Sequence, residues 1–280
     1  MKSILRIATL ACLTLLSVAA FGQTVKEVFA FNSSLPSSGG GMTPAQGRNG
    51  KLYGSTTGAG LTTSGGSIVN ISVGGKADVI YTFSQANTAS SNLTLATDGD
   101  YYGVVGSGGS SNVGLLFKIN SIGAYTSLYN FTGSSDGRYP AAPPIQASDG
   151  NLYGTTGNGS ADDGTIYKFV PATGVFTTIY SFPQDGTHGT GIIAPLIQAT
   201  DGNLYGTASA GGASGCGTIF SLSMAGKFLT AYSFSCGSGG NMPLAPLVQA
   251  SDGNFYGTTL WGGMSLQLAN VQRATASFLK

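Results

Sequence analysis

The sequence is poor in charged residues, and the residue types that carry acid–base and metal chemistry are scarce. Only 8% of the 280 residues are Asp, Glu, Lys or Arg, Glu27 is the single glutamate, and His188 is the single histidine. No nucleophile-elbow phrase, no carboxylate constellation and no glycine loop leading into a helix N-terminus is present. We therefore expect a chain that is not an enzyme and has no cofactor and no metal.

An excess of basic residues is also missing. The chain has 12 Lys and Arg and 11 Asp and Glu. Without Lys2 and Arg6 at the N-terminus it has ten basic and 11 acidic residues, a net charge of −1. A nucleic-acid-binding domain should carry a basic patch. Apolar residues make up 41% of the chain, which argues against disorder. We expect a folded chain with no nucleic-acid partner.

Long hydrophobic runs are absent after the first residues. Residues 1–22 are typical of a signal peptide, with Lys2 and Arg6 ahead of an apolar stretch at 7–20 that is short for a membrane-spanning helix. An uncleaved anchor is the alternative. We expect a secreted chain, extracellular, periplasmic or at the cell surface, with no membrane span once the signal is cleaved.

One phrase, of the type SDGNLYGTT, recurs five times. Its Tyr-Gly pairs begin 49, 51, 52 and 51 residues apart, at Tyr53, Tyr102, Tyr153, Tyr205 and Tyr256. The copies also hold short phrases such as LIQA, GTIYKF and TIYSF, rich in β-branched and aromatic residues and bounded by Gly, Asp, Asn or Pro. Such phrases predict four short antiparallel strands per copy, here a, b, c and d, which is the pattern of a β-propeller blade.

The predicted fold is therefore all-β, a propeller of about five four-stranded blades over residues 23–263. The recurring Tyr, Phe and Leu residues are interpreted as packing between blades. Residues 26–31 resemble a d-strand without a preceding a, b or c, and could complete the last blade. Residues 264–280 form a divergent tail: the fifth copy is incomplete, or residues 265–271 form a poor c-strand.

These phrases, in this order, resemble the GloVer tandem repeat of bacterial choice-of-anchor proteins. The resemblance covers roughly residues 28–263 and is best over 142–234. It implies secretion and a propeller-like repeat domain, often with a C-terminal sorting signal, and it implies no particular activity. No sorting signal follows the fifth copy here.

Two cysteines remain after the signal peptide. Cys216 precedes the c-strand of copy four and Cys236 follows its d-strand, at equal distances from Gly226 in the c–d turn. Cross-strand neighbours in a secreted chain favour a disulfide, and free or metal-bound thiols are the alternative.

Most acidic residues fall in turns. The a–b turns carry Asp98, Asp149, Asp201 and Asp252, whose side chains can accept hydrogen bonds from nearby backbone amides. Calcium binding is the alternative, but each turn offers one carboxylate, whereas calcium requires six to eight oxygen ligands.

The b–c and d–a connections lie at one end of a meander, which we call the rim. These connections are long and variable, and variable loops on a rigid scaffold commonly carry binding sites. The candidate rim residues are Arg138, Tyr139, Asp162, Asp163, His188, Asn241 and Trp261.

Three functions remain open on the sequence. The chain is a monomeric, non-catalytic extracellular binding module for a glycan or a cell-surface protein, a propeller hydrolase or lyase acting on polysaccharide, or a truncated structural fragment of a longer surface protein. Fold alone does not choose among them.

Overall fold

The computed structural model of the chain describes residues 44–57, 66–84, 88–89, 92–157, 163–262 and 269–270. The chain divides into two units, Met1–Ala30 and Phe31–Lys280, and every described residue belongs to the second. The predicted signal peptide, the N-terminal strand at 26–31 and most of the tail lie outside the described residues.

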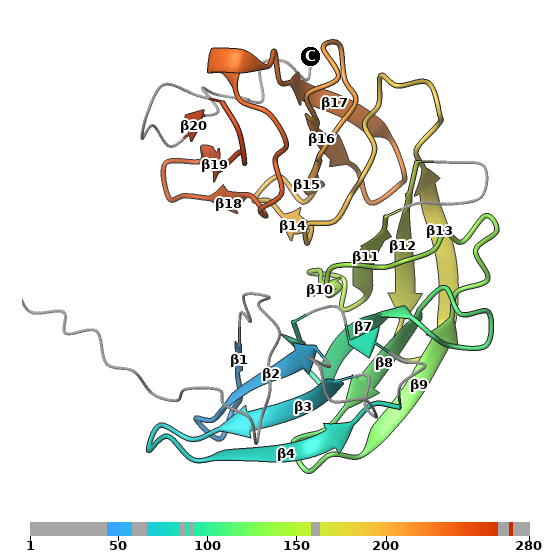
Figure 1. Ribbon diagram of the computed structural model, residues 1–280, viewed down its shortest axis with the longest axis vertical. Coiled ribbons are helices and arrows are strands. Elements are labelled where there is room, and N and C mark those ends of the chain that lie inside the picture. The colour runs from blue at the N-terminus through green and yellow to red at the C-terminus, as the bar shows by residue number, and fades with distance from the viewer. Residues whose placement is uncertain are drawn as a thin grey trace, which may run out of the picture. The chain divides into compact units, whose positions relative to one another are not determined.

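The second unit is a succession of small antiparallel sheets, as predicted, and each sheet is one repeat (Figure 1). We call the sheets blades 1 to 5. Blade 1 holds β1 (Ala45–Gln46), β2 (Leu52–Thr57), β3 (Gly66–Ile71) and β4 (Ala77–Thr82). Blade 2 holds β5 (Thr88–Ala89), β6 (Thr94–Leu95), β7 (Tyr101–Ser107), β8 (Leu115–Ile119) and β9 (Tyr125–Asn130).

The later blades repeat the same order. Blade 3 holds β10 (Ile145–Gln146), β11 (Leu152–Thr156), β12 (Thr165–Val170) and β13 (Val175–Ser181). Blade 4 holds β14 (Ile197–Gln198), β15 (Leu204–Ala208), β16 (Thr218–Leu222) and β17 (Phe228–Ser233), followed by a 3-10 turn, η1 (Gly237–Gly239). Blade 5 holds β18 (Val248–Gln249), β19 (Phe255–Gly257) and β20 (Ala269–Asn270).

Blades 1, 3 and 4 are a–b–c–d meanders with a two-residue a-strand; in blade 2 the extra strand β5 also pairs with the b-strand, and the described part of blade 5 shows three strands. The pairing of c with d shifts register at the same place in blades 1 to 4, between Ile166 and Tyr167 in blade 3 and between Ile219 and Phe220 in blade 4. Such bulges increase strand twist, which lets short sheets pack face to face. In blade 5, β20 pairs with β19, within the segment considered as a poor c-strand.

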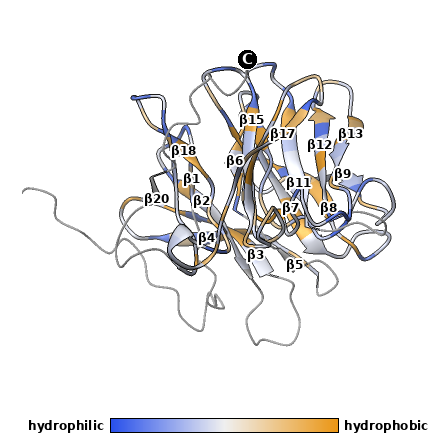
Figure 2. Ribbon diagram, turned by 90° about the horizontal axis from the view of Figure 1, so that it is seen from above, coloured by the Kyte–Doolittle hydropathy of each residue, from blue (hydrophilic) through white to orange (hydrophobic). Residues whose placement is uncertain are grey.

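The middle strands carry the core. All five residues of β15 and of β16 are buried, whereas β13 and β17 alternate between exposed and half-buried positions. Figure 2 shows the hydrophobic residues gathered along the strands and the hydrophilic ones mostly along the turns. The pattern is that of sheets buried on both faces inside and solvated at the outer edge.

Aromatic rings join neighbouring blades in a repeated cluster. Two rings come from the end of one blade's d-strand, one from the c-strand of the next blade, and one from the start of that blade's d-strand. The clusters are Tyr81, Phe83, Phe117 and Tyr125 between blades 1 and 2; Tyr129, Phe131, Tyr167 and Phe176 between blades 2 and 3; and Tyr180, Phe182, Phe220 and Phe228 between blades 3 and 4.

The cluster geometry combines stacked and edge-on pairs, the arrangements that ring quadrupoles favour. Tyr129 stacks on Phe176 at 3.7 Å between centroids, and Tyr180 stacks on Phe228 at 4.4 Å. The recurring Tyr and Phe residues therefore pack between blades, as the sequence predicted.

Blade 4 carries the predicted disulfide. Cys216 and Cys236 are bonded, with Cα atoms 5.4 Å apart. The bond joins the residues just before β16 and just after β17, so it ties the outer hairpin of this blade at its rim end.

Candidate functional site

The rim is built by backbone pairing between consecutive blades. Thr190 of the blade 3 d–a connection bridges Ala210 of the blade 4 b–c connection, and Asn241 bridges Trp261 one blade further. In the second bridge, Asn241 N donates to Trp261 O at 2.8 Å and Trp261 N donates to Asn241 O at 3.1 Å. The two kinds of variable loop therefore meet, and their backbones hold each other.

Each of the d–a connections after blades 2, 3 and 4 has a residue with positive φ next to these backbone hydrogen bonds. These residues are Tyr139, Gly191 and Met242, with φ of 56°, 69° and 57°. Tyr139 N donates to Val113 O of its own blade at 2.8 Å, and Tyr139 O accepts from Gly157 N of the next blade at 3.3 Å.

The same exchange occurs between blades 4 and 5. Met242 N donates to Cys216 O at 3.1 Å, and Met242 O accepts from Leu260 N at 3.0 Å. A non-glycine residue in this conformation is uncommon and costs free energy, so the surrounding bonds must hold it there. The loop conformation is thus fixed by the scaffold, whereas the side chains on it differ from blade to blade.

Two predicted rim residues, Arg138 and Tyr139, lie against each other. The Arg138 guanidinium carbon is 5.5 Å from the centroid of the Tyr139 ring, and Tyr139 is 45% exposed. A cation held over an aromatic face leaves a flat, positively charged contact surface.

Asn241 and Trp261 form the second pair, joined by the bridge described above. Trp261 is 62% exposed and its neighbour Leu260 is 53% exposed. The backbone N and O of Trp261 both bond to Asn241, so its exposed indole is held in place and offers a broad apolar face to a ligand.

His188 lies in the blade 3 d–a connection and is half-exposed. Its Nδ1 lies 2.6 Å from Asp185 Oδ2, and its ring centroid lies 5.3 Å from that of Phe228. Backbone hydrogen bonds, first from Thr187 N and then from His188 N, lower the pKa of Asp185 to about 2. Since Asp185 engages Nδ1, Nε2 is the ring nitrogen left for a ligand or for proton transfer.

Asp163 N donates to Phe182 O at 2.9 Å, which places this residue at the start of the hairpin of blade 3. Asp162 lies outside the described residues. Over the described ranges, no hydrogen bond or ion pair joins the Arg138–Tyr139 pair, the His188–Asp185 pair and the Asn241–Trp261 pair to one another.

Asp136, which is not among the candidate residues from the sequence, organises the rim loop between blades 2 and 3. Its carboxylate is buried and accepts from Thr132 N and Thr132 Oγ1, both at 2.7 Å, from Tyr129 Oη at 3.0 Å and from Ser134 N at 3.2 Å. It thereby folds the loop that presents Arg138. The shared Asp-Gly phrase at 136 and 185 was the available signal.

The opposite end is uniform. Asp98, Asp149, Asp201 and Asp252 occupy the a–b turns, and each Oδ2 accepts from the Tyr hydroxyl four residues on, at 2.7 to 2.9 Å. In blades 3 to 5 an a-strand glutamine links the blade to the turn of the preceding one: Gln146 Oε1 accepts from Thr97 N, Gln198 Oε1 from Ser148 N and Gln249 Oε1 from Thr200 N. Along the described parts of the chain, no three His, Cys, Asp or Glu side chains gather as metal ligands.

The comparisons with known proteins agree with this architecture. A family model described as the Gloeobacter/Verrucomicrobia repeat matches residues 14–190 and 89–276. No curated protein sequence matches the chain. Within the described residues, no helix is both long and apolar enough to cross a membrane.

Three solved structures share the propeller-like fold. The extracellular domain of a hybrid two-component system from B. thetaiotaomicron is 13% identical, with a TM-score of 0.53, over 78% of this chain and 26% of that one. TolB from Acinetobacter baumannii is 12% identical, with a TM-score of 0.50, over 79% and 49%. A GH74 enzyme from Niastella koreensis is 18% identical, with a TM-score of 0.52, over 75% and 32%.

These likenesses show the fold alone. The chain spans between a quarter and a half of the length of the three proteins, and they include an enzyme as well as an extracellular domain of a two-component system.

Proposed function

The chain belongs to the Gloeobacter/Verrucomicrobia repeat family, and from that premise and the construction of its rim we propose that it is a secreted, non-catalytic binding module. The rim holds the ligand, and the ligand class we propose is a glycan presented outside the cell. The monomeric repeat unit supplies the scaffold.

The observation that carries this proposal is the contrast between the two ends of the blades. At the turn end, the same Asp, Tyr and Gln contacts recur from blade to blade. At the rim, the backbone bridges recur but the side chains on them differ. A fixed backbone with varied side chains is the arrangement of a binding surface.

A glycan suits the exposed rings on this rim. Tyr139 and Trp261 are 45% and 62% exposed, and both are held by backbone bonds to a neighbouring blade. Aromatic faces combine apolar area with low conformational entropy. Arg138 beside Tyr139 and Asn241 beside Trp261 add hydrogen-bond donors, and His188 adds a further one between blades 3 and 4.

Secretion is supported by the signal-peptide pattern of residues 1–22 and by the Cys216–Cys236 disulfide, since such bonds persist in oxidising compartments. The absence of catalysis is part of the proposal. Around His188 in the described structure, Thr187 Oγ1 is the only hydroxyl group within hydrogen-bond distance of the ring, and it contacts the same nitrogen as Asp185.

The test is a glycan-array and cell-surface pulldown screen with the secreted chain and with Trp261→Ala and Tyr139→Ala. We expect a specific glycan hit that weakens about tenfold or more in either variant, as for exposed aromatic anchors. Ile122→Ala, which truncates a side chain 84% exposed in a c–d turn, is the matched control and should bind normally.

Two outcomes contradict the proposal. One is a screen with no specific hit, or a hit unchanged in both rim variants. The other is turnover of a polysaccharide panel that is lost in His188→Gln, which would favour a hydrolase or lyase. A hit on a cell-surface protein in place of a glycan would replace the ligand class.

A further inference from the structure

Arg138 is the only Lys or Arg residue on the described part of the rim. The other basic residues of the described ranges lie at or near the a–b and c–d turns, at the opposite end of the blades: Arg48, Lys51, Lys76, Lys118, Lys168 and Lys227. The residues that take the place of Arg138 in the next two d–a connections, just before the positive φ, are Thr190 and Asn241. A positive charge therefore marks the rim at the interface between blades 2 and 3.

No carboxylate pairs with Arg138 in the described structure. At the turn end, by contrast, lysines form ion pairs: Lys51 and Lys76 with Asp78, Lys118 with Asp100, and Lys168 with Asp149. Asp136, two residues before Arg138, uses its carboxylate on Thr132, Ser134 and Tyr129. Arg138 is half-buried, and its Nε is buried without a hydrogen-bond partner. A partly desolvated charge without a partner favours an anion as its ligand.

The loop that carries Arg138 is fixed to blade 3. Thr165 Oγ1 at the start of β12 donates to Asp136 O at 3.2 Å. The backbone at Gly137 lies so close to β11 that an added Cβ would clash with the Thr156 hydroxyl. The backbone of Arg138 is thus held in place before a ligand arrives, which lowers the entropy cost of binding.

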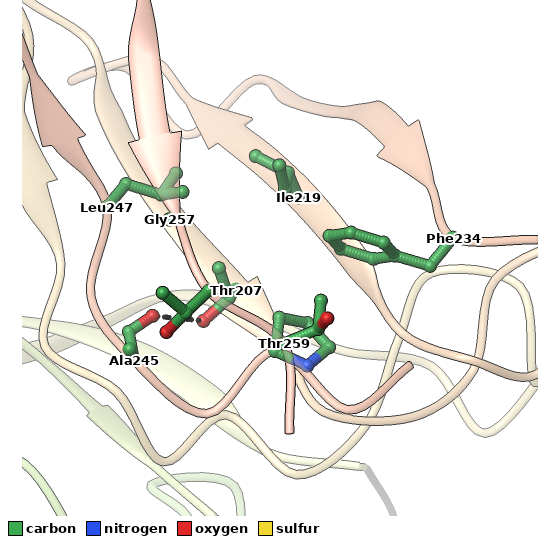
Figure 3. A pocket seen from close by; sticks show the side chains of 9 residues that line it. Thr207, Ile219, Phe234, Ala245, Leu247, Gly257 and Thr259 are labelled. Atoms are coloured by element: carbon green, nitrogen blue, oxygen red, sulfur yellow. Dashed lines mark hydrogen bonds between the residues drawn. The ribbon is translucent and has the colours of Figure 1, made fainter. Parts of the chain in front are cut away.

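Threonine hydroxyls anchor the other described d–a connections as well. Thr218 Oγ1 donates to His188 O at 3.3 Å, and Thr207 Oγ1 donates to Ala245 O at 3.4 Å (Figure 3). The connections therefore share this kind of support and differ in the side chains they carry. The charge of Arg138 is a difference in what the rim can bind, and the fold of the connection does not require it.

Tyr139 supports the guanidinium. Its ring centroid lies 5.5 Å from the Arg138 guanidinium carbon. An arginine stacked on a ring keeps its planar fork of N–H donors oriented, and such a fork matches the two coplanar oxygens of a carboxylate. Because Nε is buried, the two Nη atoms are the donors that a ligand can reach.

We propose that Arg138, supported by Tyr139, is a subsite for the carboxylate of an acidic sugar, so that the glycan bound at the rim contains uronic acid. The inference rests on the proposed glycan-binding function and names its substrate class. Arg138 pairs with the carboxylate, and the exposed part of the Tyr139 ring contacts the apolar face of the sugar.

Trimers of galacturonate, glucuronate and mannuronate are the probes, titrated calorimetrically into the full secreted chain. Each is compared with its methyl ester, which keeps the sugar and removes the charge. We expect at least one uronate trimer to bind at least about tenfold more tightly than its ester, the equivalent of about 1.4 kcal/mol. This preference should shrink as salt is added, because Arg138 is partly exposed.

Arg138→Gln should weaken uronate binding at least about tenfold and leave ester binding unchanged. Arg138→Lys should fall between the parent and Arg138→Gln, because an ammonium group supplies the charge without the planar fork. Lys227→Gln removes the same charge from an exposed residue at the turn end of blade 4, and this control should bind as the parent does. Urea unfolding midpoints establish that each variant is folded.

The inference is overturned if every uronate trimer binds no better than its ester, or if folded Arg138→Gln binds the uronate as the parent does. A neutral glycan that binds through Trp261 or Tyr139, with no uronate bound, overturns the acidic class and leaves the proposed function standing. Binding of no glycan, acidic or neutral, overturns both.

Discussion

At the scale of single residues, one side-chain type serves three purposes in this molecule. Asp149 closes an a–b turn, Asp136 is buried and folds a rim loop, and Asp185 orients His188. Burial acts to raise the pKa of Asp149, but hydrogen bonds from Asn151 and Tyr153 outweigh it and hold that pKa below its ordinary value. The groups that donate to each carboxylate distinguish the three roles.

Asp149→Ala tests the structural weight of a turn. It removes the acceptor of Asn151 N, of the Asn151 side-chain amide and of the Tyr153 hydroxyl, and should lower the free energy of unfolding by about 1–2 kcal/mol. Denaturant titration measures the loss. Asp78→Ala is the control, because Asp78 makes exposed ion pairs with Lys51 and Lys76 whose removal should cost about 0–1 kcal/mol. Equal losses in the two variants would contradict the account of the turn.

At the scale of elements, the ring clusters bind one blade to the next. The cluster between blades 3 and 4 is complete, with Tyr180, Phe182, Phe220 and Phe228 in contact. Between blades 4 and 5 the described residues show Tyr232 packed edge-on against Phe234, and Tyr232 is 42% exposed. Equivalent residues of the repeat therefore differ in what they stabilise.

Phe220→Ala and Tyr232→Ala should lower the free energy of unfolding by different amounts. Phe220 is fully buried, so its truncation leaves a cavity and should cost about 3–5 kcal/mol. Tyr232 is already partly solvated, so its truncation removes little buried area and should cost about 1 kcal/mol or less. Unfolding midpoints in urea measure both, and similar losses would show that the stacked clusters do not join the blades as described.

The repeat made the elements predictable, because its phrases mark strand b five times and strands c and d four times. The period of the repeat predicted the blades, and the equal spacing of Cys216 and Cys236 from Gly226 predicted the disulfide. The resemblance to the tandem repeat family is confirmed by the family match over most of the chain.

Contacts that depend on register across two blades could not be predicted from one sequence. The positive φ of Tyr139 and Met242 follows from backbone bonds to two blades. The burial of Asp136 depends on a loop that folds back on its own carboxylate. Each of these depends on tertiary geometry that local residue preferences do not encode.

At the scale of the whole molecule, the turn end and the rim of the second unit have different roles. The turn end repeats one set of contacts, and the rim repeats a backbone arrangement on which different side chains are displayed. The central claim is that ligand binding belongs to the rim.

Hydrogen exchange of the intact chain, with and without the glycan found in the screen, tests this claim most directly. The account predicts added protection in the rim segments 133–140, 186–191, 237–242 and 258–262, and none in the turns at 97–100, 148–151, 200–203 and 251–254. Protection confined to the turns, or spread equally over both ends, would contradict it.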